Sequence, residues 1–173
     1  MSESFQKGRR GMKIIIGNDH GGYELKLRLL RHLESRCDIE IVDIGCDSED
    51  IVRYPLYAAA VSDAVAHGEA DRGILICSTG IGMSLVANRY QGVRATLCTS
   101  SYMGKMARMH NDSNILCLGG RITGVFEALE IVDVWLDTDF EGGRHCISLE
   151  LLRQVDEAAH EGRLDGLALK ETT

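Results

Sequence analysis

The sequence is short of proline and aromatic residues, and it has no long apolar run. Its 173 residues include one proline, one tryptophan and three phenylalanines. No apolar stretch approaches the roughly 20 residues that a membrane-spanning helix requires, and the N-terminus is polar rather than signal-like. These absences predict a protein with no membrane partner. The length favours one domain that is large enough to bury a substantial core.

Basic residues are too few for a nucleic-acid-binding surface. Lysine and arginine number 19 against 26 aspartate and glutamate residues, which gives a formal net charge of -7. Nucleic-acid binding depends on basic groups that neutralise phosphates, so we predict no nucleic-acid partner. The one basic cluster, Lys7 to Arg10, lies in a segment that we interpret as a flexible tail over residues 1–11. Its composition is compatible with a cloning remnant, in which case Met12 is the native start.

The six cysteines show no pairing pattern. They form no C-x-x-C motif and no cysteine–histidine spacing of the kind that zinc sites use. Scattered thiols are typical of a reducing compartment. We therefore predict a cytoplasmic protein without disulfides and without a structural zinc site. The cysteines are Cys37, Cys46, Cys77, Cys98, Cys117 and Cys146.

Five short apolar runs rich in branched residues alternate with helical patterns. Each run has the length of a buried strand. Repeated strand–helix units produce a parallel sheet that is covered on both faces. We therefore predict a single doubly wound, Rossmann-like α/β domain over residues 12–160, with a polar tail at 161–173. The predicted strands are 12–17, 39–45, 72–78, 93–99 and 114–120, and the predicted helices are 21–36, 55–68, 80–90, 101–110, 124–138 and 147–160.

The polar motifs of the chain follow the predicted strands. "NDHGG" follows the first strand, "CSTGIG" the third and "GGR" the fifth, whereas "HNDSN" lies at the end of the helix before the fifth strand. In doubly wound sheets, ligands bind beyond the carboxyl ends of the strands. The motifs therefore predict a binding site at that edge of the sheet.

The segment "ICSTGIGMS" is incompatible with three common functions of glycine-rich loops. No lysine follows the glycines, as a Walker phosphate loop requires. Leu85 stands where a dinucleotide fingerprint has its third glycine, and no acidic residue follows about 20 positions later. Met83 stands where a cysteine phosphatase loop has its arginine. With these three functions excluded, we interpret the segment as a turn that leads from a strand into a helix.

The turn at residues 79–82 brings unpaired main-chain N–H groups together at the positive end of a helix. Such a nest stabilises an oxyanion, and a helix N-terminus favours the thiolate form of a cysteine. Cys77 at the strand end is then equipped to remove a proton next to a carbonyl group and to stabilise the resulting enediolate. The alternative is that Cys77 is a small buried core residue.

Further positions are candidates for acid–base or anion-binding roles, each with a structural alternative. Asp19 and His20 are flanked by glycines that admit a ligand to the main chain, although Asp19 is also suited to capping a helix. His110 is either an acid–base group that titrates near neutrality or a charge at a helix C-terminus. Arg121 and Arg144 follow glycines and suit an anion clamp, or they are surface charges.

Together these motifs resemble the B-type ribose-5-phosphate isomerases and the related galactose-6-phosphate isomerase subunits. The segments "DHGGYELK", "DIG", "YPLYA", "GILICSTGIG", "ANR", "GVRA", "HNDSN", "GGR" and "EGGRH" occur in the order and spacing of that family and cover about residues 12–155. Nine segments in register are a specific signal. The "HND" and "GGRH" segments place the chain nearer to the ribose branch.

The resemblance implies a metal-free, cofactor-free aldose–ketose isomerisation of ribose 5-phosphate and ribulose 5-phosphate through a cis-enediolate. It implies that Cys77 is the base, assisted by Thr79, and that His110 opens the sugar ring from a second subunit. It also implies a homodimer, or a tetramer, whose last helix packs on the partner through the aliphatic face of residues 147–155. The resemblance assigns an anion hole to Ser78, Gly80, Ile81 and Gly82, and substrate binding to Asp19, His20, Tyr54, Asn111, Arg121 and Arg144.

Ser148 is the main departure from the family pattern. Ribose-type members usually carry a second arginine four positions after the first in "GGRHxxR", and a serine cannot give phosphate the bidentate charged contact of arginine. Another aldose phosphate, such as allose 6-phosphate or a four-carbon sugar phosphate, is therefore an alternative substrate. A non-catalytic sugar-phosphate-sensing domain is a further alternative, although such a domain needs no cysteine base.

Overall fold

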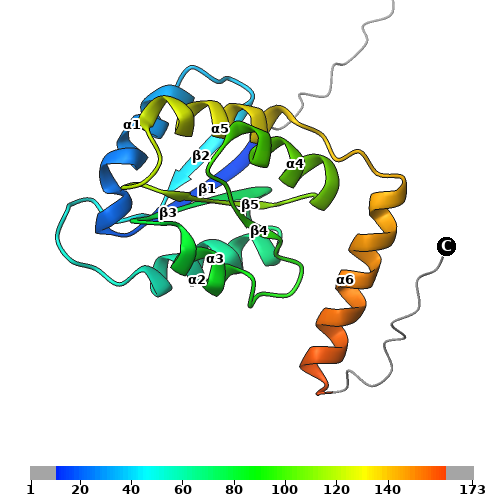
Figure 1. Cartoon of the computed structure of the whole chain (residues 1–173). Helices are drawn as coiled ribbons and strands as arrows, with labels where there is room; N and C mark the ends of the chain where they lie inside the picture. The colour runs from blue at the N-terminus through cyan, green and yellow to red at the C-terminus, as the bar shows by residue number, and fades with distance from the viewer. Residues whose placement is uncertain (1–10, 163–173) are drawn as a thin grey trace, which may run out of the picture.

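The computed structural model describes residues 11–162, which contain one five-stranded sheet (Figure 1). The strands are β1 (Met12–Asn18), β2 (Ile39–Asp43), β3 (Arg72–Cys77), β4 (Ala95–Leu97) and β5 (Ile115–Gly119). They pair in the order β2-β1-β3-β5-β4, and every pair is parallel. This sheet confirms the predicted doubly wound α/β fold. Of the two predicted tails, residues 1–10 and 163–173 lie outside the described residues.

The helices cover both faces of the sheet. They are α1 (Tyr23–Leu33), α2 (Tyr54–Ala66), α3 (Ile81–Ala87), α4 (Ser101–Asn111), α5 (Val125–Asp137) and α6 (Arg144–His160), with a short 3-10 turn, η1 (His20–Gly22), before α1. Helices α1, α4 and α5 pack on one face and α2 and α3 on the other, whereas α6 lies beyond one end of the sheet (Figure 1).

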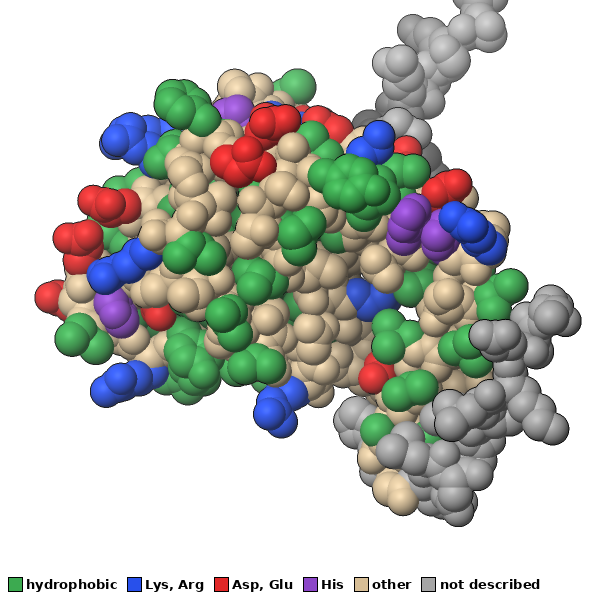
Figure 2. Space-filling model, in the orientation of Figure 1, with side chains coloured by type: hydrophobic (Ala, Val, Ile, Leu, Met, Phe, Trp, Pro, Cys, Tyr) green, Lys and Arg blue, Asp and Glu red, His purple; other side chains and the backbone are tan. Residues whose placement is uncertain are grey.

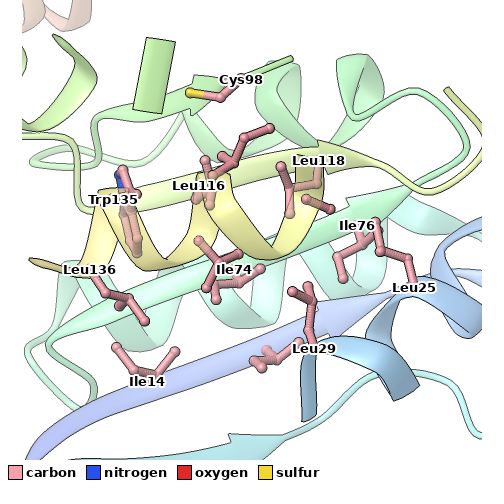
Figure 3. Close-up of a cluster of buried hydrophobic side chains, with 14 of the residues drawn as sticks. Ile14, Leu25, Leu29, Ile74, Ile76, Cys98, Leu116, Leu118, Trp135 and Leu136 are labelled. Carbon is pink, nitrogen blue, oxygen red and sulfur yellow. The ribbon is translucent and has the colours of Figure 1, made fainter. Parts of the chain in front are cut away.

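Alternation along the strands divides the core into two layers. In β1, Ile14 and Ile16 pack with α1 and α5, and Ile15 packs with α2. Figure 3 shows the first layer, in which Trp135 of α5 is fully buried beside the strands. Full burial of one large apolar side chain contributes about 1.5–3 kcal/mol. The same alternation places Cys77 in the second layer, under α2 and α3.

Several helix boundaries differ from the predicted ones, and two of the differences have a clear local cause. Helix α3 is shorter than predicted because the Asn88 side chain turns to β4, where it donates to Ala95 O and accepts from Ala95 N, both at 2.9 Å. Helix α6 begins earlier than predicted, at Arg144. It follows Gly142 and Gly143, whose φ angles of 70° and 57° turn the chain into the helix.

The two edges of the sheet carry different elements. The loops after β1, β3 and β5 lie at the carboxyl edge. Helix α4 starts at the carboxyl edge and runs back, so its last turn lies at the opposite, amino edge. There Asn114 leads into β5, and the Asn114 carbonyl accepts the Gly73 N–H of β3 at 2.8 Å. Helix α6 starts from the same region, because the Glu141 N–H donates to Met109 O of α4 at 3.0 Å. A five-residue strand separates the edges by about 16 Å.

Helix α6 stands apart from the rest of the described chain. Figure 2 shows an opening between it and the body, and a cavity of about 270 Å³ lies there between Leu152 and residues 93–96. The large apolar side chains of α6 are 42–60% exposed; they are Ile147, Leu151, Leu152 and Val155. The helix is not a membrane span, since none of the helices within residues 11–162 is long and apolar enough to cross a bilayer.

Candidate active site

Cys77 occupies the last position of β3, where the strand gives way to the loop before α3. It is 6% exposed and belongs to the core layer under α2 and α3. The Gly80 N–H donates to its sulfur over 3.1 Å, an arrangement that accommodates a thiolate. Cys77 therefore combines the core packing of the structural alternative with the amide donor that the catalytic interpretation requires.

The loop after β3 has the form of an anion-binding turn. Gly80 adopts a φ of 76°, and α3 begins immediately after it. The Ser84 N–H donates to Gly80 O at 3.1 Å, so the N–H groups of Ile81 and Gly82 precede the helical hydrogen-bond ladder. The Ile81 N–H makes a long contact of 3.4 Å with Thr79 Oγ1. These amides are those of the predicted anion hole, whose role stays a prediction.

The other buried cysteines, Cys46, Cys98 and Cys117, also belong to the core. Burial raises the pKa of the Cys98 and Cys117 thiols, and it also raises the pKa of Cys46. A raised pKa keeps a thiol protonated and unreactive at neutral pH. These three residues therefore serve as core residues, whereas the sulfur of Cys77 accepts a main-chain N–H.

Three loops converge on Cys77 at the carboxyl edge. The Gly120 N–H donates to Cys77 O at 2.7 Å and the Arg121 N–H donates to Ser78 O at 3.1 Å, so the loop after β5 is tied to the loop after β3. Gly21 in the loop after β1 packs so closely that an added methyl group would lie 2.2 Å from Ser78 Oγ. The structure thus brings together residues from three of the predicted motifs.

Asp19, His20 and Tyr54 border the same loops. The buried Asp19 carboxylate accepts a main-chain N–H of η1 at 2.9 Å, so it caps this turn as the structural alternative expects. His20 Nδ1 lies 3.2 Å from Val52 O and 3.3 Å from Val52 N, which fixes the ring and leaves Nε2 for a ligand. The Tyr54 ring packs against the main chain of Gly82 at the start of α3.

The remaining predicted residues, His110, Asn111 and Arg144, lie at the amino edge. His110 and Asn111 end α4, and Arg144 begins α6. Because the 11 residues of α4 rise about 16 Å, the depth of the sheet separates His110 from Cys77 within one chain. We call the two sets the carboxyl-edge group (Asp19, His20, Tyr54, Cys77, Ser78, Thr79, Gly80, Ile81, Gly82 and Arg121) and the amino-edge group (His110, Asn111 and Arg144).

Glu141 was not predicted as a functional residue, and His145 was considered only as the neighbour of Arg144 in the "EGGRH" segment, yet both lie against His110. The His110 and His145 rings stack with centroids 4.1 Å apart and planes inclined by 14°. Glu141 Oε2 lies 3.8 Å from His110 Nε2 and 3.7 Å from His145 Nε2. Both residues belong to the segment "EGGRH". This segment is far from His110 in the sequence, so no residue spacing predicted that the three side chains meet.

Replacing Gly80 with alanine is expected to disturb the loop beside Cys77. The added methyl group would lie 2.5 Å from Leu97 Cδ1 and 3.0 Å from the main chain of Leu118, at a positive φ. Backbone strain and overpacking together should cost about 2–4 kcal/mol in the free energy of unfolding, measured by urea denaturation. Gly68→Ala is the matched control, because Gly68 has a φ of 71° and nothing within 4 Å; it should lose about 1–2 kcal/mol. Equal losses would contradict the tight packing of Gly80.

The fold and this site define an α/β enzyme of the doubly wound class, with a thiol and main-chain amides at the carboxyl edge where such sheets bind small ligands. The sequence pattern of the Ribose/Galactose Isomerase family matches residues 14–152. The chain belongs to this family and is an isomerase.

Relatives and solved structures agree with this assignment. The chain is 43% identical to ribose-5-phosphate isomerase B of Escherichia coli (strain K12) over 145 residues, which are 84% of this chain and 97% of the relative. The structure of ribose-5-phosphate isomerase B from Clostridium thermocellum is similar, with a TM-score of 0.83, 47% identity and coverage of 86% of this chain and 99% of that one. Ribose-5-phosphate isomerase B from Mycoplasma genitalium, solved with bound ribulose-5-phosphate, has a TM-score of 0.81, 35% identity and coverage of 86% and 99%. The resemblance predicted from the motifs is confirmed.

Proposed function

We propose that the chain interconverts ribose 5-phosphate and ribulose 5-phosphate as a B-type ribose-5-phosphate isomerase. The similar proteins named above carry this activity in their names, and one of them holds ribulose-5-phosphate. The observation that carries the proposal in this chain is the thiol of Cys77 at the carboxyl edge, with the Gly80 N–H 3.1 Å from its sulfur.

In this proposal the Cys77 thiolate removes the proton from C2 of the open-chain aldose. The electron pair of that C–H bond forms the C1–C2 double bond, and the carbonyl oxygen on C1 becomes an oxyanion that the N–H groups of Ile81 and Gly82 stabilise. The proton then passes from the sulfur to C1, and Thr79 transfers the O2 hydroxyl proton to O1, which gives the ketose. Residues of the chain supply every step, without a metal or an organic cofactor.

The remaining predicted residues are proposed to bind the sugar phosphate. Asp19 and Tyr54 border the loops around Cys77 and are assigned to the sugar hydroxyls. His20, whose ring is held through Nδ1, is assigned to the phosphate together with the guanidinium groups of Arg121 and Arg144. His110 is assigned to ring opening as an acid–base group.

We also propose that the active unit is a homodimer with shared sites, which can assemble further into a tetramer. The carboxyl-edge and amino-edge groups of one chain lie too far apart to act on one sugar, so a second chain has to bring its amino-edge group to the first chain's Cys77. The exposed apolar residues of α6, Ile147 to Val155, supply a surface for that pairing. A twofold dimer makes two equal sites of this kind.

Ser148 favours a second candidate substrate, another aldose phosphate, for the same type of reaction. It is exposed on α6 one turn after Arg144, so this segment offers the phosphate one arginine where ribose-type members have two. We expect kcat/KM to be highest for ribose 5-phosphate among purified ribose 5-phosphate, allose 6-phosphate and erythrose 4-phosphate, in an assay that detects each ketose product. A higher kcat/KM for either of the other sugars would replace ribose 5-phosphate as the substrate and leave the isomerase chemistry in place. No turnover of any aldose phosphate would overturn the proposed function.

The cysteines support a cytoplasmic location, which we include in the proposal. All six are free, and two of them, Cys37 and Cys146, are exposed. Exposed thiols persist where the compartment is reducing. A proton-abstracting thiol at Cys77 has the same requirement, because oxidation would remove the base.

A further inference from the structure

Three side chains of types that can bind a metal ion meet where α6 joins the body of the protein. His110 comes from the last turn of α4, Glu141 from the loop after α5 and His145 from the first turn of α6, and one ligand atom from each lies within 4.8 Å of the others. Figure 2 shows histidine side chains gathered beside acidic and basic ones at this end of the molecule. The predicted site uses His110, but neither Glu141 nor His145.

The main chain holds the three residues together. The Glu141 N–H donates to Met109 O at 3.0 Å, which fixes the loop against the end of α4. The His145 N–H donates to Gly142 O at 3.1 Å. The cluster is therefore formed by the backbone and does not depend on the chance approach of long side chains.

The polar atoms of the cluster are close together but poorly satisfied. His145 Nε2 is buried and has no hydrogen-bond partner, because its separation of 3.7 Å from Glu141 Oε2 is too long for a hydrogen bond. The same carboxylate oxygen lies 3.8 Å from His110 Nε2. Two imidazole nitrogens and one carboxylate oxygen thus lie near one another, and no hydrogen bond joins them.

We propose that His110, Glu141 and His145 bind a divalent late first-row metal ion, with Zn²⁺ as the best-fitting case. Two histidines and one glutamate are an established donor set for zinc, with water in the fourth position. Zinc bonds of about 2.0–2.1 Å place tetrahedral ligand atoms about 3.3 Å apart, so the two separations from Glu141 Oε2 need to contract by roughly half an ångström. The stacked His110 and His145 rings also need to rotate, so that both nitrogens face the ion. Imidazole also suits copper and nickel, whereas Mg²⁺ and Ca²⁺ prefer oxygen ligands.

Metal binding here would inhibit the isomerase. An ion bound to His110 ties up the imidazole that is assigned to ring opening, so Zn²⁺ should slow turnover of cyclic sugar phosphate. This consequence rests on the proposed function, whereas the binding of the ion does not.

The test is Zn²⁺ binding to the full chain, freed of metal by dialysis and kept reduced, measured by competition with a zinc indicator. We expect one ion per chain, and an affinity that falls roughly 10–100-fold or more in Glu141→Gln and in His145→Gln, since loss of even an outer-shell partner costs that much. Two controls should keep the affinity of the unmodified chain: His67→Gln, which removes another histidine that lies near a carboxylate, and Cys146→Ser, which removes the exposed thiol next to the cluster.

Three results would overturn the metal site: no binding at micromolar Zn²⁺, unchanged affinity in both ligand variants, or loss of binding in Cys146→Ser with retention in His145→Gln. Thermal melting of each variant confirms that it is folded. Isomerase assays of the same samples separate the two proposals. Binding that leaves turnover unchanged would support the metal site and contradict the role of His110 in ring opening.

Discussion

Cys77→Ala is expected to keep the fold and to lose most of the isomerase activity. Proton transfer by a positioned group accelerates a reaction by roughly 10²–10⁴-fold, so kcat on ribose 5-phosphate should fall by about that factor. The fold should survive because the change removes one sulfur atom from the edge of a core layer, at a cost of about 1 kcal/mol. Steady-state kinetics and urea denaturation measure the two effects separately.

Cys98→Ala is the matched control for this experiment. Cys98 is at least as buried as Cys77 and follows strand β4 at the edge of the sheet, but it belongs to the opposite core layer. The control should therefore lose a similar amount of stability and keep its turnover. Near-normal activity of Cys77→Ala, or an equal loss of activity in both variants, would remove Cys77 as the base.

Mixing two inactive variants is expected to restore activity, because the proposed site takes residues from two chains. The first variant is Cys77→Ala, and the second carries His110→Ala together with Arg144→Ala. After unfolding and joint refolding, half of the dimers contain one chain of each kind. In each of these dimers one site has every native residue, so about one quarter of the activity of the unmodified protein should return.

The control for this mixing experiment places all three substitutions in the second variant. Every site of the mixed dimer then lacks Cys77, and no activity should return. Native mass spectrometry verifies that mixed dimers are present in both samples. Mixed dimers that stay inactive in the first experiment would show that His110 acts on the Cys77 of its own chain, against the separation of the two edges in the structure.

Much of the fold was predictable because its signals are local. Apolar runs of strand length alternate with helical patterns, and this alternation alone leads to a parallel sheet covered on both faces. The turn after β3 was also predictable, since Gly80 and Gly82 follow a strand end directly. The position of β5 between β3 and β4 was not, because periodicity reports which residues are buried and carries no information about which strand lies next to which.

The candidate site was predictable to different degrees at the two edges. Most residues around Cys77 come directly after strands whose carboxyl ends lie at the same edge of the sheet. The fold alone therefore predicts that these residues lie close together. The cluster around His110 depends on a contact between the end of α4 and the loop before α6, whose residues are far apart in the sequence and share no spacing pattern. The contact of Glu141 and His145 with His110 was therefore missed. The family resemblance had implied that His110 acts from a second subunit, and the end of α4 at the edge away from Cys77 is consistent with it.

In the proposed dimer, the position of α6 links assembly to activity. By the proposed assignments, a newly made chain carries the groups for proton transfer and for ring opening at opposite ends, so a lone chain cannot complete the conversion of a cyclic sugar phosphate. Under the proposed pairing, the contact that covers the apolar side of this helix is the same event that completes the chemistry. Correct assembly and the onset of catalysis are then a single step, and an unpaired or misfolded copy remains harmless to the cell's pool of sugar phosphates.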